Sequence, residues 1–287
     1  MNNTIHTLIT GASEGLGKAF AFECARHKMN LVLVSLPGTG LPGLSEFIAR
    51  NFGVSVIIFE KDLSQPSNCY DLFLEIEKME LPVNILINNA GMGSTVLFEE
   101  GSPEFYEKQI RLNVLATTLL THLFIKNLRG ATPSRILNVS SLASFFYLPK
   151  KQVYGGTKSY IYYFSKSLRK EFKDRGVTVS VLCPGGINTN LSVTLLNKNS
   201  PWTSRISVMN PEEVAAEAIE GLLKNKEVIV PGKLNRFFLL LDKILPGAVK
   251  TFLTNHTMKN IDVPNWVVPY LFNSAPVLVH ATDAKVY

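Results

Sequence analysis

The sequence contains little cysteine, and its cysteines follow no known spacing for a disulfide framework or a metal site. Cys24, Cys69 and Cys183 are odd in number and widely separated. The five histidines show no ligand spacing either. We therefore expect no bound metal, and we interpret the cysteines as small buried residues in a reducing compartment.

Long hydrophobic runs are also absent. The longest apolar stretch, 237–245, is interrupted by Asp242 and Lys243 and is too short to cross a bilayer. Residues 1–10 lack the basic segment and apolar run of a signal peptide. These absences lead us to expect a cytoplasmic protein.

Positive charge is present, but it is not concentrated in one segment. The 287 residues include 29 Lys and Arg against 23 Asp and Glu, which gives a net charge of +6. The basic residues are dispersed, and few of them alternate with aromatic residues. A solvated basic surface explains this pattern better than a nucleic-acid site, so we expect no nucleic-acid partner. Weak attraction to an anionic membrane or to acidic ligands is the alternative.

Short β-branched runs alternate with longer segments of helical period. The expected strands are 5–10, 31–35, 54–59, 85–88, 135–140, 177–183 and 228–230, and the expected helices include 15–27, 103–128, 152–174 and 211–224. This alternation predicts an α/β fold of Rossmann type, a doubly wound parallel sheet of about seven strands with helices on both faces. No linker or repeat divides 1–230, which we interpret as one domain.

Residues 231–287 are interpreted as a C-terminal helical tail. Its apolar residues recur at spacings compatible with one helix face; these are Leu234, Phe237, Phe238, Leu241, Ile244 and Leu245. The tail could cover a substrate cleft, form the interface of a homodimer or homotetramer, or make weak contact with a membrane surface. Packing against the domain is the simplest expectation.

Three glycines, Gly11, Gly15 and Gly17, lie between the first expected strand and the first expected helix. Glycine there allows a tight turn, close approach of a pyrophosphate to the backbone, and close packing of the helix, whose first N–H groups are free. A glycine-rich run alone is weak, because ordinary turns use glycine too. Its position between strand and helix favours a dinucleotide site.

The sequence here resembles the short-chain dehydrogenase/reductase family, whose turn is Thr-Gly-x-x-x-Gly-x-Gly, as in 10–17. Further segments match in the same order: Asn-Asn-Ala-Gly at 88–91, Asn113, Ser141, Tyr154 with Lys158, and Pro-Gly-x-x-x-Thr at 184–189. Together they span about 5–230 and are highly specific. The resemblance implies an oxidoreductase that uses NAD(P), with 1–230 as its NAD(P)-binding catalytic domain. A softer likeness points to the branch of hydroxysteroid dehydrogenases and 3-ketoacyl reductases.

Tyr154 and Lys158 are four residues apart in an expected helix, so their side chains share one face. An adjacent ammonium favours phenolate, so we expect it to lower the pKa of Tyr154 from about 10 toward neutrality. A tyrosine and a lysine at this spacing usually serve only to pack the helix against its neighbours. Ser141 ends the fifth strand, where its hydroxyl can bond a substrate carbonyl; Ser140 competes with it, and the resemblance selects Ser141. Asn113 either caps a helix kink or, as the resemblance implies, positions a water in a proton relay with Lys158.

The cofactor site predicted from the turn and the resemblance extends over several segments. Its residues are Gly11, Ser13, Glu14, Gly15, Leu16, Gly17, Ser35, Leu36, Asp62, Leu63, Asn89, Ala90, Gly91, Tyr154, Lys158, Pro184, Gly185, Ile187 and Thr189. An acid at the end of the second strand would bind the ribose 2′-hydroxyl of NAD, whereas arginine would accept the phosphate of NADP. Ser35 and Leu36 are neither, and Glu14 stands where many NADP users carry a basic residue. The missing acid favours NADP narrowly over NAD.

The substrate is predicted from the apolar and aromatic residues expected around the site. These are Met92, Val96, Leu97, Phe145, Phe146, Tyr147, Leu148 and Trp202, although core or interface positions explain several of them equally well. Residues 190–205 have the length of a flexible lid. We predict a hydrophobic ketone of acyl or polycyclic type, or its alcohol, with Tyr154 as the acid or base. A catalytically silent nucleotide-binding sensor or scaffold is the alternative.

Overall fold

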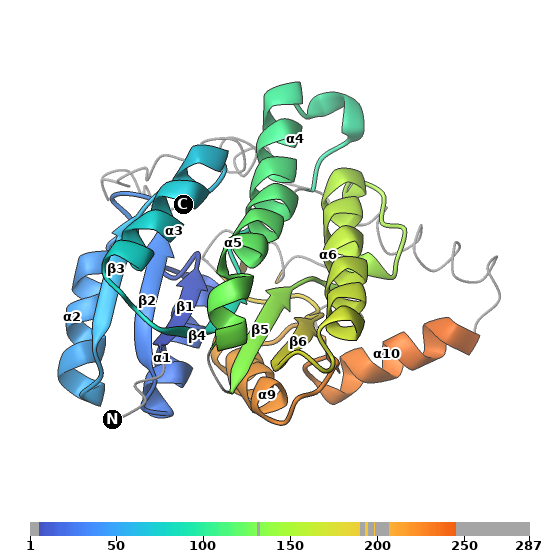
Figure 1. Cartoon of the computed structure of the whole chain (residues 1–287). Helices are drawn as coiled ribbons and strands as arrows, with labels where there is room; N and C mark the ends of the chain where they lie inside the picture. The colour runs from blue at the N-terminus through green and yellow to red at the C-terminus, as the bar shows by residue number, and fades with distance from the viewer. Residues whose placement is uncertain are drawn as a thin grey trace, which may run out of the picture.

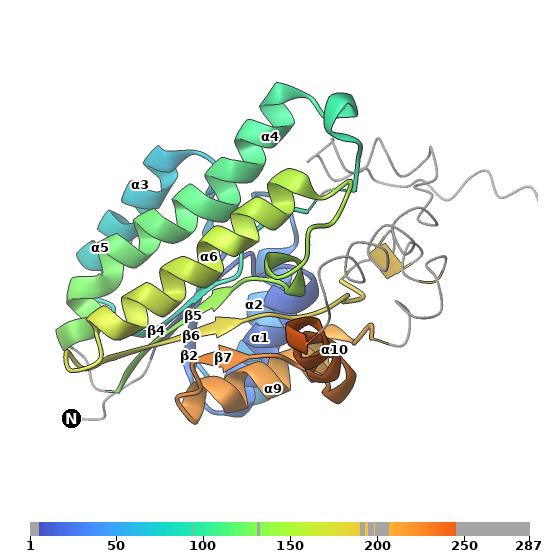
Figure 2. The ribbon, with the colours of Figure 1, turned by 90° about the vertical axis from the view of Figure 1, so that its right-hand side faces the viewer.

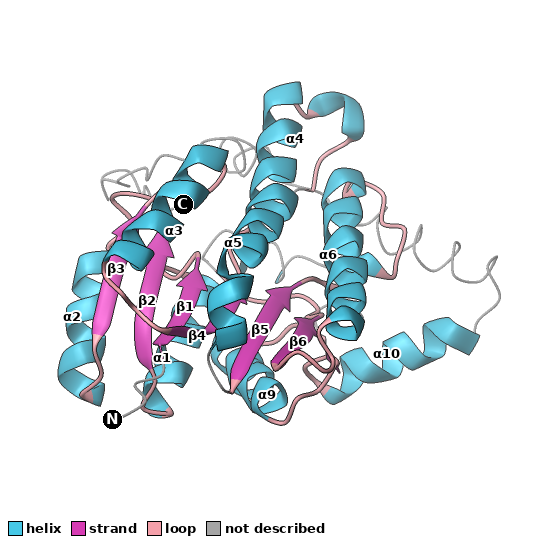
Figure 3. Ribbon diagram, viewed as in Figure 1, coloured by secondary structure: helices cyan, strands magenta, loops and turns pink. Residues whose placement is uncertain are grey.

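The computed structural model describes residues 6–93, 95–130, 133–189, 193–194, 198 and 207–244. One parallel sheet lies at the centre of these residues (Figure 3), with the strand order β3-β2-β1-β4-β5-β6-β7. Its strands are β1 (His6–Thr10), β2 (Asn30–Ser35), β3 (Val56–Glu60), β4 (Val83–Asn88), β5 (Ser134–Val139), β6 (Val177–Leu182) and β7 (Val228–Ile229). The expected seven-stranded parallel sheet of Rossmann type is confirmed. Its strand order reverses between β1 and β4, where such sheets open a crevice at the carboxyl ends of the strands.

Helices cover both faces of the sheet (Figure 1), and the side view separates the two layers (Figure 2). One layer contains α1 (Gly15–Arg26), α2 (Leu41–Phe52) and α9 (Pro211–Leu223). The other contains α3 (Pro66–Lys78), α4 (Pro103–Ile110), α5 (Thr117–Gly130) and α6 (Gln152–Glu171). Two short 3-10 turns precede helices of the second layer: η1 (Phe98–Glu100) comes before α4, and η3 (Leu142–Ser144) comes before α6. The helix α10 (Lys233–Ile244) extends at the lower right of Figure 1.

The buried strands connect two apolar cores, one under each helical layer. Along β2, Leu31 and Leu33 belong to the core under α1 and α9, whereas Val32 and Val34 belong to the core under α3 and α5. Successive side chains of a strand point to opposite faces, so a strand covered on both sides must be apolar throughout. This explains the continuous hydrophobic runs in the sequence.

Two helices, α2 and α3, were not among the helices expected from the sequence. Each has a proline in its first turn, Pro42 in α2 and Pro66 in α3. Proline is well tolerated there because its missing N–H would have no partner within the helix. Turn-forming residues before both helices masked their helical period.

The long helix expected over 103–128 is present, but it is not uniform. Its α-helical parts, α4 and α5, are joined by a π-helical turn, η2 (Arg111–Ala116). A π turn carries one extra residue per hydrogen-bonded ring and often marks a functional site. The interruption centres on Asn113.

The start of the predicted tail packs against the domain with a polar residue. Asn235 is 2% exposed, whereas Phe237 and Leu240 are 55% and 60% exposed. Phe237 of the expected apolar face is therefore largely exposed and not packed against the domain, and Leu245 lies outside the described residues. Among the described residues, no helix combines the length and apolar character that a membrane span requires.

Candidate active site

The glycine turn between β1 and α1 is so tight that side chains do not fit. A Cβ on Gly17 would lie 1.9 Å from the Gly11 carbonyl oxygen. Gly11 and Gly15 have φ angles of +66° and +51°, which residues other than glycine rarely adopt. A Cβ on Gly15 would also lie 2.9 Å from the Thr189 Cβ. The turn thus forms a backbone cradle at the start of α1, with predicted cofactor residue Thr189 against it.

The segment after β4 is fastened to this turn by hydrogen bonds. The Thr10 Oγ1 accepts from the backbone N–H groups of Asn89 and Ala90, both at 3.0 Å. The Asn89 side chain donates to the carbonyl oxygens of Thr10 at 2.9 Å and of Gly11 at 3.2 Å. Asn88, in contrast, is buried and donates to side chains of α5 and β5. Asn89 and Ala90 therefore border the cradle, while Asn88 holds the core together.

A carboxylate from β3 lies beside the end of β2, although β2 itself ends without an acidic residue. Ser35 lies beside Glu60 of β3 in the sheet register, and a Glu60 oxygen accepts from the Gly38 N–H at 3.0 Å. The hydroxyls of Ser35 and Thr39 are 2.9 Å apart. Sequence reasoning missed Glu60 because this residue follows the strand predicted over 54–59 and its proximity to Ser35 depends on strand pairing.

The predicted cofactor residues that follow β3, Asp62 and Leu63, have a clear local role. The Asp62 Oδ1 accepts from the backbone N–H of Ser64 at 2.9 Å and from its hydroxyl at 2.7 Å. Leu63 is buried. These bonds form a turn of the type that aspartate favours, which sets the path of the chain between β3 and α3.

Ser141, Tyr154 and Lys158 lie together at the carboxyl end of β5. The Ser141 side chain lies close enough to Tyr154 to affect its pKa, and its hydroxyl accepts from the Ala143 N–H at 3.1 Å. The Lys158 Nζ is 5.8 Å from the centre of the Tyr154 ring. The neighbouring Ser140 donates to the Lys158 carbonyl oxygen at 2.7 Å, so it supports α6 and does not face the tyrosine.

The buried amide of Asn113 joins three segments around Lys158. Its Oδ1 accepts from the Met92 N–H at 2.8 Å, and its Nδ2 donates to the Met92 carbonyl at 2.9 Å and to the Thr157 hydroxyl at 3.0 Å. A Cβ on Gly91 would lie 3.1 Å from the Asn113 Oδ1 and 3.4 Å from the Lys158 Nζ. Asn113 thus fixes the segment after β4 against α6.

Burial governs the protonation of the tyrosine and the lysine. It raises the pKa of Tyr154, and the Ser141 hydrogen bond opposes this rise. It lowers the pKa of Lys158 to about 8, although the Lys158 Nζ also donates to the Val139 carbonyl at 2.8 Å. The expected lowering of the Tyr154 pKa by the ammonium is therefore wrong for the protein alone, because removal of water penalises the phenolate more strongly.

The segment after β6 is held from two sides. The Pro184 carbonyl accepts from the Leu142 N–H at 2.8 Å, close to Ser141. On the other side, a Cβ on Gly185 would lie 2.7 Å from the Oδ1 of Asn235. Ile187 forms a parallel bridge with Met209. Asn235 was not predicted, since nothing in a local pattern shows that α10 returns to this segment.

The apolar residues expected around the substrate have mixed positions. Val96 is buried, Leu97 is 42% exposed and Tyr147 is 98% exposed. A Cβ on Gly93 would lie 3.8 Å from the Tyr154 ring, so the segment after β4 does reach the site. Tyr147 points into solvent and is not a lining residue. Trp202 and most of the predicted lid over 190–205 lie outside the described residues.

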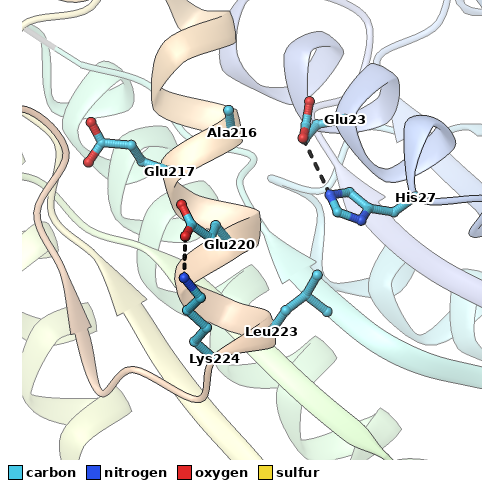
Figure 4. A pocket seen from close by; sticks show the side chains of 7 residues that line it. All are labelled: Glu23, His27, Ala216, Glu217, Glu220, Leu223 and Lys224. Atoms are coloured by element: carbon cyan, nitrogen blue, oxygen red, sulfur yellow. Dashed lines mark hydrogen bonds and ion pairs between the residues drawn. The ribbon is translucent and has the colours of Figure 1, made fainter.

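Two hollows differ in their relation to these residues. One, of about 420 Å³, lies between the glycine turn and the segment after β6, and its lining includes Ser13, Glu14, Gly15 and Thr189. The other, of about 440 Å³, lies between α1 and α9 and contains none of the predicted residues (Figure 4). Its Glu23 pairs with His27 at 3.4 Å, and its Glu220 pairs with Lys224. We therefore place the candidate site at the glycine turn, which borders the first hollow, and at the group of Ser141, Tyr154 and Lys158.

Comparison with known proteins agrees with this geometry. A family model described as short chain dehydrogenase matches residues 6–200. The chain is 35% identical over 194 residues to 17-beta-hydroxysteroid dehydrogenase type 3 of Mus musculus, covering 67% of this chain and 63% of that protein. It is 29% identical over 209 residues to the very-long-chain 3-oxoacyl-CoA reductase of Homo sapiens, covering 68% and 64%. The chain thus spans less than two thirds of the length of these two relatives.

A solved structure extends the likeness to the whole fold. A short-chain dehydrogenase from Sphingobium yanoikuyae in complex with NADPH superposes with a TM-score of 0.72 at 27% identity, covering 85% of this chain and 97% of that one. The fold of this chain therefore also exists in an experimental structure.

Proposed function

The chain belongs to the short-chain dehydrogenase family, and from this premise we propose that it interconverts a ketone and its alcohol with a nicotinamide cofactor. The single observation that carries the proposal is the grouping of Ser141, Tyr154 and Lys158 next to the segment after β4 that borders the glycine cradle. A tyrosine beside a serine hydroxyl and a buried ammonium is suited to moving a proton to or from a carbonyl oxygen.

The residues divide the chemistry between them. The Ser141 hydroxyl would donate to the carbonyl oxygen and stabilise the negative charge that develops there. Tyr154 would donate its proton to that oxygen in reduction and remove it in oxidation. Lys158, held by the Val139 carbonyl at 2.8 Å, would stabilise the phenolate left on Tyr154. A bound nicotinamide would supply or accept the hydride.

Two further residues would serve as positioning groups. Asn113 lies on the π turn and is bonded to Met92 and Thr157. In this proposal it orders a water that links Lys158 to solvent, so that Tyr154 can regain its proton after each turnover. Thr189 would bind the cofactor near the glycine turn, because it lies directly against Gly15.

The glycine cradle fits a dinucleotide. The 1.9 Å approach of a Gly17 Cβ to the Gly11 oxygen leaves only backbone at the start of α1, where free N–H groups attract phosphate. The absence of an acid at Ser35 favours NADP, whereas the Glu60 carboxylate, at the end of the neighbouring strand β3, favours NAD. We propose NADP as the first choice, and comparison of the two dissociation constants in the wild type and in Glu60→Gln tests it.

For substrate and assembly we propose a hydrophobic acyl or polycyclic ketone and a homodimer or homotetramer in the cytoplasm. By their names, the two relatives reported above act on a hydroxysteroid or on a 3-oxoacyl-CoA. The exposed Phe237 and Leu240 of α10 support weak contact with a membrane surface as a further proposal. Co-sedimentation with anionic vesicles should then fall in a variant with serine at both positions, and unchanged binding would exclude this contact.

The decisive experiment follows NADPH and NADH absorbance with a panel of hydrophobic ketones. Tyr154→Phe should lower kcat by about 10²–10⁴-fold, the usual contribution of a general acid, while cofactor binding persists. Tyr163→Phe is the matched control, because Tyr163 lies on the same helix and is 71% exposed. Equal rates in Tyr154→Phe and the wild type would refute the mechanism. A silent sensor would instead bind cofactor tightly and turn over no ketone.

A further inference from the structure

Two buried amides, those of Gln109 and Asn113, hold the backbone of Met92. The Asn113 Oδ1 accepts from the Met92 N–H at 2.8 Å, and its Nδ2 donates to the Met92 carbonyl oxygen at 2.9 Å. The Gln109 Nε2 donates to the same oxygen at 3.2 Å. A carbonyl oxygen has two lone pairs and can accept from both amides. The proton relay proposed above includes Asn113 but gives Gln109 no task.

Gln109 lies in the last turn of α4, four residues before Asn113 on the π turn. Side chains at this spacing lie near one another on a helix, so both amides reach the same residue. Gln109 is 0% exposed. An amide buried to this extent lowers stability unless hydrogen bonds replace its contacts with water, whereas an apolar side chain of similar length would incur no such cost. The bond to Met92 therefore points to a role beyond filling space in the core.

Met92 lies between two glycines that approach the proposed catalytic residues. A Cβ on Gly91 would lie 3.4 Å from the Lys158 Nζ, and a Cβ on Gly93 would lie 3.8 Å from the Tyr154 ring. Residues 91–93 belong to no helix or strand, and glycine leaves the backbone free to adopt many conformations. The close approach is therefore imposed by the residue between the glycines, which the two amides hold.

We propose that Gln109 is a positioning residue of the active site: together with Asn113 it holds Met92, so that the segment 91–93 stays packed against Tyr154 and Lys158. Without Gln109, the Met92 carbonyl loses one of its two donors, and the segment can move away from the ring. Bulk water then reaches the phenol. The inference rests on the proposed function, because that function makes Tyr154 the proton donor.

The protonation of Tyr154 reports the position of this segment. Burial raises the pKa of Tyr154, so entry of water should lower that pKa. The ring also faces the ammonium groups of Lys151 and Lys158, whose Nζ atoms are 5.6 and 5.8 Å from its centre, and Cys183 lies close enough to Lys158 to affect the Lys158 pKa. All three groups remain in variants of Gln109. A change in the Tyr154 pKa therefore measures the loss of cover over the phenol.

Gln109→Met keeps the length of the side chain and removes its N–H donors. It should lower kcat for ketone reduction by about three- to tenfold, the equivalent of one hydrogen bond. The dissociation constant of NADPH should change by less than about twofold, because the glycine turn is untouched. The Tyr154 pKa should fall by about half a unit or more. Ultraviolet titration of tyrosinate, with each protein compared with its own Tyr154→Phe version, measures this pKa without turnover.

Gln109→Glu tests the donated hydrogen bond itself. A protonated carboxyl group can donate to the Met92 carbonyl, whereas a carboxylate has no hydrogen to donate and its charge repels that oxygen. Its kcat relative to the wild type should be near one at about pH 5 and fall at least to that of Gln109→Met at about pH 8. If Gln109→Met does not fold, this pH dependence decides alone. A ratio that does not vary with pH would overturn the inference.

Asn84→Leu is the matched control. Asn84 is also a buried amide, at 8% exposure, but it lies at the other end of β4, where its Oδ1 accepts from the His6 N–H at 3.4 Å. This change should lower the melting temperature and leave the pKa of Tyr154 where it is. An unchanged pKa in Gln109→Met, or an equal shift in Asn84→Leu, would also overturn the inference. A shift confined to Gln109→Met, in a protein that reduces no ketone, would refute the proposed function alone.

Discussion

Asn235 and Gly185 meet at the junction between α10 and the segment after β6. The Asn235 Nδ2 donates to the Pro231 carbonyl at 3.0 Å and to the Ser207 carbonyl at 3.3 Å. Its Oδ1 is buried with no hydrogen-bond partner among the described residues, and only the missing side chain of Gly185 leaves room for it. The start of the predicted tail is therefore tied to a segment predicted to bind the cofactor.

Gly185→Ala should disturb this junction. A Cβ there would lie 2.7 Å from the Asn235 Oδ1, so we expect the free energy of unfolding to fall by about 1–3 kcal/mol, as for other overpacked sites. The dissociation constant of NADPH or NADH should rise as well. Urea unfolding and fluorescence titration measure the two effects.

The contact can be isolated with a double variant. Because Asn235→Ala removes the opposing oxygen, the double variant should lose less stability than the sum of the two single changes. Gly43→Ala, at a helical position with nothing within 4 Å, is the control and should be neutral or stabilising by up to about 1 kcal/mol. Strict additivity in the double variant would show that Gly185 and Asn235 do not interact.

Gly17→Ala should damage the cofactor cradle more severely. Its Cβ would lie 1.9 Å from the Gly11 oxygen, and a backbone atom cannot move aside as the end of a flexible side chain can. We expect the dissociation constants of both nicotinamide cofactors to rise by about tenfold or more, a loss of about 1.4 kcal/mol or more. Wild-type affinity in this variant would contradict the cradle as described.

The two directions of the reaction should depend on pH in opposite ways. Reduction needs protonated Tyr154, and burial raises the pKa of this phenol, so the proton is retained through neutral pH. We expect kcat/KM for ketone reduction to stay level near pH 7 and to fall in the alkaline range, while alcohol oxidation accelerates there. A reduction rate that rises with pH would argue against Tyr154 as the proton donor.

Lys158 should make stability depend on pH above neutrality. Its pKa is lowered by burial from 10.5 to about 8, so between these values the unfolded chain binds more protons than the folded one. Stability attributable to Lys158 therefore rises with pH over this window, and below pH 8 its charged form is buried at a constant cost.

The measurement compares Lys158 with Lys158→Met, both in a Tyr154→Phe background so that the phenol does not titrate. Between pH 8 and pH 10.5, the unfolding free energy of the protein with Lys158 should rise by up to about 3 kcal/mol relative to that of the Lys158→Met protein. A difference that does not vary with pH would mean that the Lys158 ammonium is not desolvated.

Local patterns in the sequence determined the parallel sheet, the glycine turn and the helix that carries Tyr154 and Lys158. Strand runs are apolar because both faces are covered, and the turn needs glycine because backbone approaches backbone. These requirements act on residues that are close in the sequence, so local sequence patterns predict them. At Asn113 the sequence indicated a buried amide in an apolar helix, but it did not predict the π turn.

Only the tertiary structure decided which distant groups meet. Strand pairing brings Glu60 beside Ser35, the return of α10 brings Asn235 against Gly185, and the segment after β4 brings Thr95 to Lys151. The pKa of Tyr154 followed the same rule: the spacing to Lys158 predicted a lowered value, whereas burial raises it. Desolvation depends on everything that packs around a group, and a sequence specifies that packing only through the completed fold.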